Sequence, residues 1–472
     1  MRSARTGHRW AATIVGAILM SLASAITSSA QMFATLHNFD NEDGSEIEGP
    51  LLEATDGDLY GTTYANGAYF GGTVYRITPD GAFTTIYNFC RQANCADGSD
   101  PVGGLVQGTD GSFYGTTAGG GLYDAGTVFK ITRSGTLTTL YTFDIGDGAG
   151  PAGLVQGVDG DFYGATFGGG NFSSGTLFKI TPTGTLTTIY NFGSQDTDGS
   201  DPNGPLVQGA DGYFYGTTFL GGSLGGGTVF SVTPGGNLTT FYSFCILCAN
   251  GYEPYAPLIA ATDGNFYGTT NASGMDQSGT VFRLTPSGTL TTVYNFCLQG
   301  GCQAVIRPGW LVQGADGNLY GIASAGGAGR DTAGMLFKLT TAGTFTDLLR
   351  FDGKDGASPG FLVQDTNGSF YGTTFQGGTY DRGTVFRFSQ GLAPFVEAQP
   401  TSGPVGTSVN ILGSNLTGAT SVSFNGTAAT FTVSKSGTSI KTTVPVGATT
   451  GPVQVVTPSG TLTSNVNFQV LP

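Results

Sequence analysis

One phrase is repeated seven times along the chain, and one copy of it is split between the two ends. Its centre is a Tyr-Gly pair, and successive copies are 49 to 54 residues apart. The copies lie at Tyr60, Tyr114, Tyr163, Tyr215, Tyr267, Tyr320 and Tyr371. The segment that closes each repeat also occurs seven times, but its first copy, residues 33–39, precedes every Tyr-Gly pair, and the seventh repeat stops after Phe388 without one. This offset is unexplained in an open stack of repeats. It predicts a closed ring in which the first segment completes the last repeat.

Each repeat contains four short segments of strand-forming residues. In the second repeat they are residues 105–107, 113–117, 127–132 and 137–143, rich in Val, Thr, Tyr and Phe and bounded by Gly, Pro or Asp. Four-stranded units repeated radially form a β-propeller. A solenoid is the alternative, but it needs polar caps at its ends. The predicted fold class is therefore all-β, with a seven-bladed β-propeller over residues 31–391 that is closed by an N-terminal strand.

Loop lengths predict which face of the ring is free to bind. A short Asp-Gly or Asn-Gly turn joins the first two strands of each repeat, and another short turn, such as residues 181–184, joins the last two. In an antiparallel meander these turns share one edge, called here the tight-turn face. The long and variable connections share the opposite edge, the long-loop face. Variable loops on a rigid scaffold are the usual place for binding.

The two ends of the chain differ from the repeats. Residues 1–30 contain three arginines, an apolar stretch and a small-residue cleavage pattern, which predicts a secretory signal peptide. A membrane anchor is the alternative, although serines interrupt the apolar stretch. No other segment approaches the ~18 apolar residues that span a bilayer. Residues 392–472 alternate apolar and polar residues in short runs, which predicts a small β-sandwich.

Charge narrows the classes of partner. Signal cleavage removes three of the 18 basic residues and none of the 32 acidic ones, so the mature chain has a formal charge of −17. An acidic surface disfavours nucleic acid and anionic membranes, whose phosphates require basic side chains. It is compatible with cations and with neutral sugars.

The six cysteines all follow the last strand of a repeat. An even count in a secreted chain favours disulfides over a metal or redox site. Their short spacing predicts three local bridges, Cys90–Cys95, Cys245–Cys248 and Cys297–Cys302.

Two resemblances are carried by specific motifs. The Tyr-Gly-Thr-Thr, Gly-Gly and Gly-Thr-Val-Phe phrases of residues 31–391 resemble the GloVer (Gloeobacter/Verrucomicrobium) tandem repeat of secreted bacterial choice-of-anchor proteins. Residues 392–472 are similar to immunoglobulin-like IPT/TIG domains through Pro-x-Ser-Gly-Pro-x-Gly-Thr and Val-x-Phe-Asn-Gly. The resemblance implies display outside the cytoplasm, at or beyond the cell surface of a bacterium, and it implies no reaction.

Groups that could carry out proton transfer are scarce. His37 is the only histidine after residue 30, and it occupies an aromatic position of its repeat. Nucleophile-elbow and zinc-helix motifs are absent from the sequence. The sequence therefore predicts no catalytic residues and no cofactor, although blades of a propeller can assemble a site from distant residues.

Two sets of residues on the long loops are candidates for binding. Acidic residues in the connections between repeats could hold Ca²⁺, which prefers six to eight oxygens, or could be ordinary turn formers. The acidic candidates are Asp97, Asp100, Asp196, Asp198 and Asp201. Aromatic residues recur three positions before the Gly that opens the third strand. Exposed aromatic side chains in this position suit sugars or peptides. The alternative is that these side chains fold back and pack on their own loops. The aromatic candidates are Tyr69, Tyr123, Phe172 and Tyr380, with Trp310 added because it replaces a repeat glycine.

Together these features predict a secreted or cell-surface, non-enzymatic binding or adhesion protein, present as a monomer, whose long-loop face holds an extracellular glycan or protein. The alternatives are an extracellular polysaccharide-active hydrolase or lyase, and a purely structural surface protein.

Overall fold

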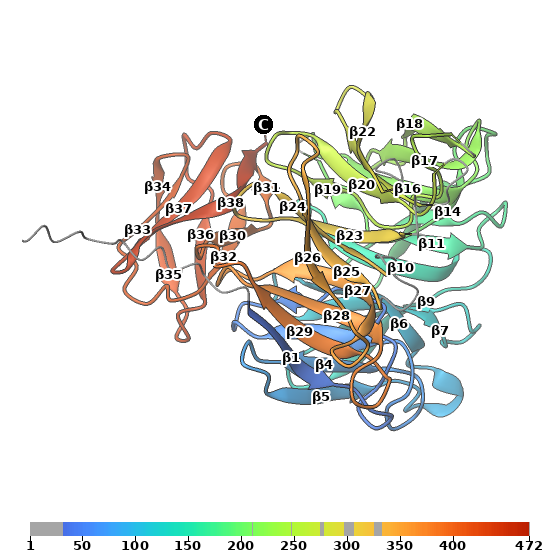
Figure 1. Cartoon of the computed structure of the whole chain (residues 1–472), viewed down its shortest axis with the longest axis horizontal. Helices are drawn as coiled ribbons and strands as arrows, with labels where there is room; N and C mark the ends of the chain where they lie inside the picture. Colours follow the sequence, from blue (N-terminus) through green and yellow to red (C-terminus); the bar gives the residue numbers. More distant parts are fainter. Residues whose placement is uncertain are drawn as a thin grey trace, which may run out of the picture.

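The computed structural model of the chain describes residues 32–209, 211–246, 248–273, 278–296, 306–324 and 333–471. The predicted signal peptide, residues 1–30, lies outside the described residues. A ring of blades and a smaller C-terminal β-domain lie side by side (Figure 1). No helix in the described ranges is long and apolar enough to cross a membrane, and the helical turn that is present is the short 3₁₀ segment η1 (Ala93–Cys95).

The ring contains seven antiparallel sheets, so the predicted seven-bladed propeller is confirmed. Blades 1 and 2 contain β2 (Leu52–Glu53), β3 (Leu59–Thr63), β4 (Thr73–Ile77), β5 (Phe83–Asn88), and β6 (Ser99–Gln107), β7 (Phe113–Gly119), β8 (Thr127–Ile131), β9 (Leu137–Thr142). Blades 3 and 4 contain β10 (Ala149–Gln156), β11 (Phe162–Gly168), β12 (Thr176–Ile180), β13 (Leu186–Asn191), and β14 (Ser200–Pro202), β15 (Val207–Gln208), β16 (Phe214–Leu220), β17 (Gly225–Val232), β18 (Leu238–Cys245). Blades 5 and 6 contain β19 (Ile259–Ala260), β20 (Phe266–Thr270), β21 (Thr280–Leu284), β22 (Leu290–Asn295), and β23 (Pro308–Gln313), β24 (Leu319–Ala323), β25 (Met335–Leu339), β26 (Phe345–Arg350).

Blade 7 is built from both ends of the ring, as the offset of the repeat predicts. Its strand order is β1-β29-β28-β27, with β27 (Ala357–Gln364), β28 (Phe370–Gln376), β29 (Thr384–Ser389) and the N-terminal β1 (Met32–Asn38). Met32 pairs with Ser389, and Asn38 pairs with Thr384. In Figure 1 the dark blue β1 lies beside the orange β29.

The Tyr of each Tyr-Gly pair links its strand to the tight turn before it. In blade 2, the Tyr114 hydroxyl donates to Asp110 at 2.9 Å, and Lys130 from the next strand donates to the same carboxylate at 2.7 Å. Five other blades repeat the Tyr-to-Asp bond at 2.7 to 3.1 Å. The repeated Asp therefore shapes the turn and satisfies a tyrosine that is otherwise buried.

The Gly after that Tyr and the two threonines that follow have packing roles. A Cβ on Gly115 would lie 2.6 Å from the Phe129 ring, so the aromatic residue of the third strand requires glycine opposite it. The second Thr bonds to the Thr that opens the third strand, as between Thr117 and Thr127 at 2.8 Å. In blade 6 the same two positions are the apolar pair Ala323 and Met335, which lie in one core cluster.

Neighbouring blades are held together by aromatic stacking and by a glutamine. Phe162 of blade 3 stacks on Tyr114 of blade 2 with ring centroids 4.1 Å apart, and the same contact recurs between other blades. At the end of the first strand, Gln107 accepts from the Thr55 backbone of the preceding blade at 3.0 Å. Buried apolar residues between the sheets form a series of small cores, one at each blade interface.

The C-terminal domain is a β-sandwich around one core. Its strands are β30 (Val396–Gln399), β31 (Ser402–Gly403), β32 (Ser408–Gly413), β33 (Ser421–Phe424), β34 (Thr427–Ala429), β35 (Phe431–Val433), β36 (Ser439–Thr443), β37 (Gly451–Thr457) and β38 (Gly460–Val470). A parallel pairing of Val396 with Ser464 joins the two halves into one continuous sheet path. The core includes Phe424 and Phe468.

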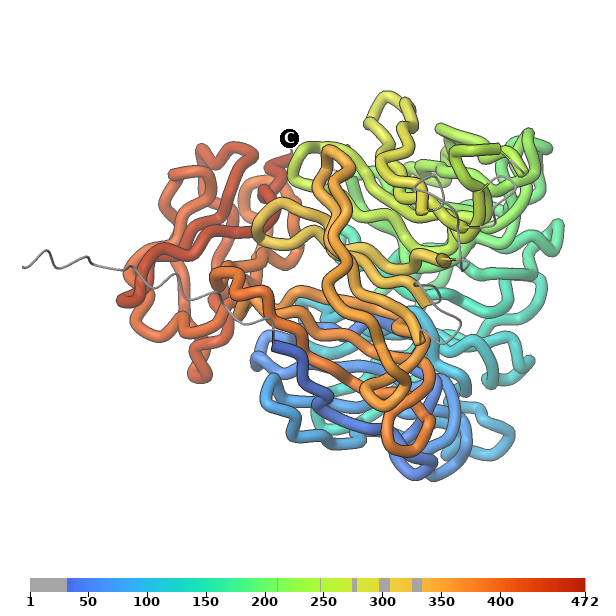
Figure 2. Tube along the Cα trace, viewed as in Figure 1, coloured from blue at the N-terminus to red at the C-terminus, as the bar shows by residue number. Residues whose placement is uncertain are grey.

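The C-terminal domain packs on the tight-turn face of the propeller. Thr438 donates to the Thr55 carbonyl at 2.9 Å, and the Phe395 backbone donates to the Thr366 carbonyl at 3.0 Å. Figure 2 shows the domain, in red and orange, against one side of the ring. A cavity of about 240 Å³ remains between Gln399 and the ends of the inner strands β6, β10 and β15. The tight-turn end of the central channel is therefore covered.

Candidate functional site

The recurring aromatic residues of the long loops are exposed. Tyr69 is 48 % exposed, Tyr123 58 %, Phe172 52 % and Tyr380 59 %. Other large apolar side chains in or beside the same loops are exposed as well: Phe70, Leu122 and Leu224. These side chains do not fold back into a core. They form a set of apolar tips around the outside of the long-loop face, called here the rim.

Trp310 lies elsewhere. It belongs to the inner strand β23 and is half-buried, with its ring 5.2 Å from Phe361 in an edge contact. It packs on the core cluster between blades 6 and 7. The structure places it in the wall of the propeller and not on the rim.

Two of the acidic candidates hold their own loops. Asp97 is fully buried and accepts hydrogen bonds from the Tyr87 hydroxyl at 2.7 Å and from two backbone N–H groups at 3.1 Å. Asp198 is 2 % exposed and accepts from Tyr190 in the same way at 2.8 Å. A third acidic candidate, Asp196, is exposed on the surface. Across the residues that the structure describes, no three His, Cys, Asp or Glu side chains come together as a metal site.

Two of the three predicted disulfides are present. Cys90 is bonded to Cys95, and Cys245 to Cys248, each within a connection that leaves the last strand of a blade. Cys297 and Cys302 lie outside the described residues, and their bridge stays a prediction. The two observed bridges pin loops of the long-loop face.

His37 is used in packing at the end of the closing strand. Its ring stacks on Phe83 with centroids 3.8 Å apart, and its Nε2 lies 2.6 Å from the Asp43 carboxylate. This contact joins blade 7 to blade 1. The His–Asp pair thus occupies the aromatic position that the repeat predicts.

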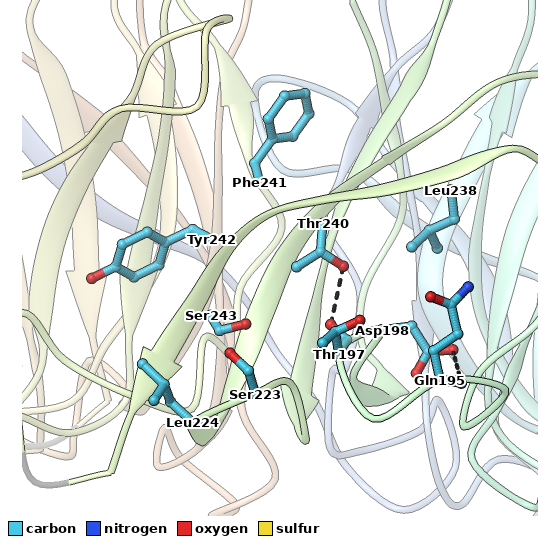
Figure 3. A pocket seen from close by; sticks show the side chains of 10 residues that line it. All are labelled: Gln195, Thr197, Asp198, Ser223, Leu224, Leu238, Thr240, Phe241, Tyr242 and Ser243. Carbon is cyan, nitrogen blue, oxygen red and sulfur yellow. Dashed lines mark hydrogen bonds between the residues drawn. The ribbon is translucent and has the colours of Figure 1, made fainter.

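An open groove of about 530 Å³ lies at the outer edge of blade 4 (Figure 3). The Thr240 hydroxyl donates across it to the Thr197 carbonyl at 3.1 Å, and Leu224 of the rim forms part of its wall. The groove has two ionisable groups. The Asp198 carboxylate accepts hydrogen bonds from its own loop and from Tyr190, and the Tyr242 hydroxyl accepts a hydrogen bond from Asn250. The groove offers neutral hydroxyl and amide groups beside an apolar tip.

A second feature of the long-loop face is the end of the central channel on that face, called here the mouth. Inner strands of neighbouring blades contact one another, as β6 does with β2 and β10, and so they line the channel. One residue per blade lies where the chain enters the inner strand: Glu46, Asp100, Gly150, Asp201, Glu253, Arg307 and Ser358. Four of these seven residues are acidic.

Backbone geometry explains how this ring of residues is placed. Six of the seven have left-handed φ values between 51° and 63°, although five of the six are not glycine. This conformation lets the N–H reach the preceding blade, as when Asp100 donates to the Gly71 carbonyl at 3.0 Å and Glu253 to Gly226 at 2.8 Å. Bonds between blades therefore hold the backbone of Asp100, Asp201 and Glu253 at the mouth.

Aromatic side chains lie between these acids. The residue after Tyr-Gly-Thr-Thr, or after Tyr-Gly-Ala-Thr in blade 3, is aromatic in blades 1, 3, 4 and 7: Tyr64, Phe167, Phe219 and Phe375. Phe219 contacts Tyr255, which precedes the inner strand β19 of the next blade, with ring centroids 6.3 Å apart. Tyr255 is 60 % exposed, and Phe167 is 48 % exposed. The mouth therefore combines carboxylates with accessible aromatic rings.

The pKa values of these groups respond to one another's charges. Burial raises the pKa of the Glu48 carboxyl, and the charges of Glu46 and Asp100 raise it further. The surrounding protein wall raises the pKa of the Tyr255 hydroxyl even though its ring is accessible, and the Glu48 charge adds to this effect. Glu48 belongs to blade 1 and Tyr255 to blade 5. Their coupling thus acts across the channel.

Sequence reasoning identified Asp100 and Asp201 but did not identify the mouth. The available signal was an acidic residue directly before the proline that enters an inner strand, as in Asp100-Pro101, Asp201-Pro202 and Glu253-Pro254. The aromatic residue after Tyr-Gly-Thr-Thr is a second signal. Both are repeat positions whose meaning depends on the closed ring.

Two protein families match different parts of the chain. The model of a Gloeobacter/Verrucomicrobia repeat matches residues 21–157 and 110–327, and that of an IPT/TIG domain matches residues 395–470. No curated protein sequence matches the chain.

Several solved structures have a similar fold at low identity. The extracellular domains of two proteins described as hybrid two-component systems of B. thetaiotaomicron have TM-scores of 0.51 and 0.50, with 11 % and 12 % identity. The alignments cover 94 % and 92 % of this chain and 60 % and 54 % of those chains. A puromycin hydrolase has a TM-score of 0.47 and 14 % identity, over 79 % of this chain and 54 % of that one. These likenesses concern the fold.

Proposed function

The chain belongs to the Gloeobacter/Verrucomicrobia repeat family, and from this premise we propose that it is an extracellular, non-enzymatic binding protein whose long-loop face holds a glycan or protein. Its two modules are a propeller over residues 31–391 and an IPT/TIG domain over residues 392–472. The IPT/TIG domain serves as a spacer or second contact, and the protein acts as a monomer.

The observation that carries this proposal is the contrast between the two faces of the ring. The C-terminal domain covers the tight-turn face at Thr55 and Thr366. The opposite face presents Tyr69, Tyr123 and Tyr380 with about half of each side chain exposed. Exposed aromatic tips on rigid loops supply contact area at a small cost in conformational entropy. This face is therefore the better binding surface.

Extracellular location is supported by two features. The Cys90–Cys95 and Cys245–Cys248 bridges are stable in oxidising compartments. The pattern of residues 1–30 is that of a cleaved leader.

One observation favours a second candidate, a polysaccharide-active hydrolase or lyase. Glu48 is a half-buried carboxyl with a raised pKa, close to the charges of Glu46 and Asp100. A carboxyl with a raised pKa beside an ionised one is the arrangement that glycosidases use. A purely structural role is the third candidate.

One set of assays on the secreted protein separates the three candidates. A glycan array and a panel of extracellular proteins test binding, and hydrolysis and lyase assays on the glycans that bind test turnover. The proposal expects saturable binding without turnover. Turnover that disappears in Glu48→Gln would establish the enzyme, and the absence of both binding and turnover would favour the structural role.

A further inference from the structure

We propose that the mouth of the central channel binds an organic cation, an alkylammonium or guanidinium group, and so selects the charge of the ligand. This inference deepens the proposed function, because the rim then supplies contact area while the mouth supplies the charge preference. The rim and the mouth are formed by different residues, so they can be tested with separate variants.

The first argument is the combination of carboxylates and aromatic rings. Cations are attracted both to carboxylates and to the faces of aromatic rings. Tyr64 illustrates the arrangement, because its backbone donates to the Glu46 carbonyl at 2.9 Å and the Asp100, Glu48 and Glu46 charges raise the pKa of its hydroxyl. Burial is the first cause of that rise. A phenol ring lies here within the field of three carboxylates from two blades.

The second argument concerns buried hydroxyl groups behind the mouth. Thr62, Thr217 and Thr373 are at most 2 % exposed, and among the described residues their Oγ1 atoms have no hydrogen-bond partner. The equivalent Thr116 and Thr269 donate to carbonyls of the inner strands, Val102 at 3.2 Å and Gly309 at 2.9 Å. This repeat position is thus directed at the channel wall. The hydroxyls at this position therefore make the wall behind the mouth polar.

The spacing of the acids favours an organic cation over a metal ion. Calcium requires several oxygens at 2.3–2.6 Å from one point. In the described part of the chain the acids do not form such a cluster. Glu48 and Tyr255 enter from blades 1 and 5 and are coupled through space. An extended cation can contact groups separated in this way, whereas a single ion cannot.

The net charge of the face reinforces this preference. Arg307 is the one basic residue among the seven that enter the inner strands, against four acids. A concave site with charge of one sign focuses the field and raises the local concentration of counter-charged ligands. The same focusing predicts a steep loss of affinity with added salt.

The test uses spermidine as a free polyamine, trilysine as a peptide-borne amine, and triacetylated spermidine, in which all three nitrogens are amides, as the uncharged control. Binding to the full-length mature protein is measured by calorimetry at low ionic strength and pH 7. The variant Glu48→Gln/Asp100→Asn removes two charges from the mouth, and asparagine tolerates the left-handed φ of Asp100. The matched control Glu42→Gln/Asp196→Asn removes two charges from exposed positions of the same protein.

We expect at least one amine probe to bind, the acetylated probe not to bind, and the mouth variant to lose about tenfold or more in affinity. The affinity of the matched control for the amine probe should stay within about twofold of the wild-type affinity. Binding of spermidine without binding of trilysine would indicate that the ligand is a free amine. Binding of trilysine without binding of spermidine would indicate that it is a peptide. Tyr69→Ala/Tyr123→Ala/Tyr380→Ala leaves the amine affinity unchanged, which separates this inference from the role of the rim. Absence of amine binding, equal loss in both double variants, or full competition by millimolar Ca²⁺ would overturn it.

Discussion

Thr366 donates two hydrogen bonds to Glu53, one from its backbone N–H at 2.8 Å and one from its hydroxyl at 2.6 Å. The two residues are 313 positions apart and join blade 7 to blade 1. In most other blades the position of Glu53 is a glutamine that accepts the same backbone bond, as Gln107 does from Thr55. Blade 1 thus closes the ring with a carboxylate where its neighbours use an amide.

Removal of β1 tests the other half of ring closure. Deletion of residues 32–38 leaves β29 with an unpaired edge and removes His37 from its stack on Phe83. We expect the melting temperature to fall by about 10 °C or more, or the protein to become insoluble. Met32→Ala, at the exposed first residue of the same strand, serves as the control that keeps the strand pairing. A normally melting β1 deletion would refute closure by this strand.

Stability should depend on pH through the acids at the junction of the two domains. Burial raises the pKa of Asp365 to about 6, and burial also raises the pKa of Glu53 and of Glu397. The folded state then binds protons more tightly than the unfolded state. The resulting stability is full below the unfolded pKa of about 4 and is lost as the pH rises through about 6.

We therefore expect the melting temperature to be a few degrees higher at pH 5 than at pH 7. Asp365→Asn should reduce this difference, and its amide oxygen can still accept the bond from the Asn367 backbone. Asp196→Asn, at an exposed acid, should leave the difference unchanged. Equal pH dependence in wild type and Asp365→Asn would show that another group is responsible.

Asp97 should matter for stability and not for metal binding. Asp97→Ala leaves the Tyr87 hydroxyl and two backbone N–H groups without their acceptor in a buried loop. We expect a loss of about 3 kcal/mol in unfolding free energy, measured by chemical denaturation. Chelators should leave the wild type unchanged. If EDTA lowers the stability of the wild type as much as the substitution does, the loop holds a cation.

The fold was predictable because each repeat restates the same local chemistry. Seven copies of Tyr-Gly with Asp-Gly turns indicate the strands, and the displaced copy at residues 33–39 indicates closure. The site was less predictable. Asp97 and Asp100 are three residues apart, yet one is buried under Tyr87 and the other lies at the channel mouth. Only the left-handed turn at Asp100 and the closed ring separate their roles, and neither is visible in residue type.

Trp310 gives the same lesson for aromatic residues. It is as large and as conspicuous in the sequence as the rim tyrosines, but it lies in the irregular part of β23, between Pro308 and Leu311, where its ring contacts Phe361. Exposure of Tyr69, Tyr123 and Tyr380 follows from their positions at loop tips. Position in the repeat therefore predicted exposure better than residue type did.

The central claim, that the long-loop face binds the ligand, is tested most directly by the affinity of one triple variant. The probe is the glycan or protein that gives the strongest signal on the array. Aromatic hot spots cost about 2 kcal/mol or more each when truncated, so Tyr69→Ala/Tyr123→Ala/Tyr380→Ala should lower affinity by orders of magnitude. Tyr213 is 41 % exposed beside a tight turn, and Tyr213→Ala should leave the affinity within a few-fold of the wild-type affinity. Circular dichroism should show both variants folded. A folded triple variant that binds as tightly as the wild type would contradict the account.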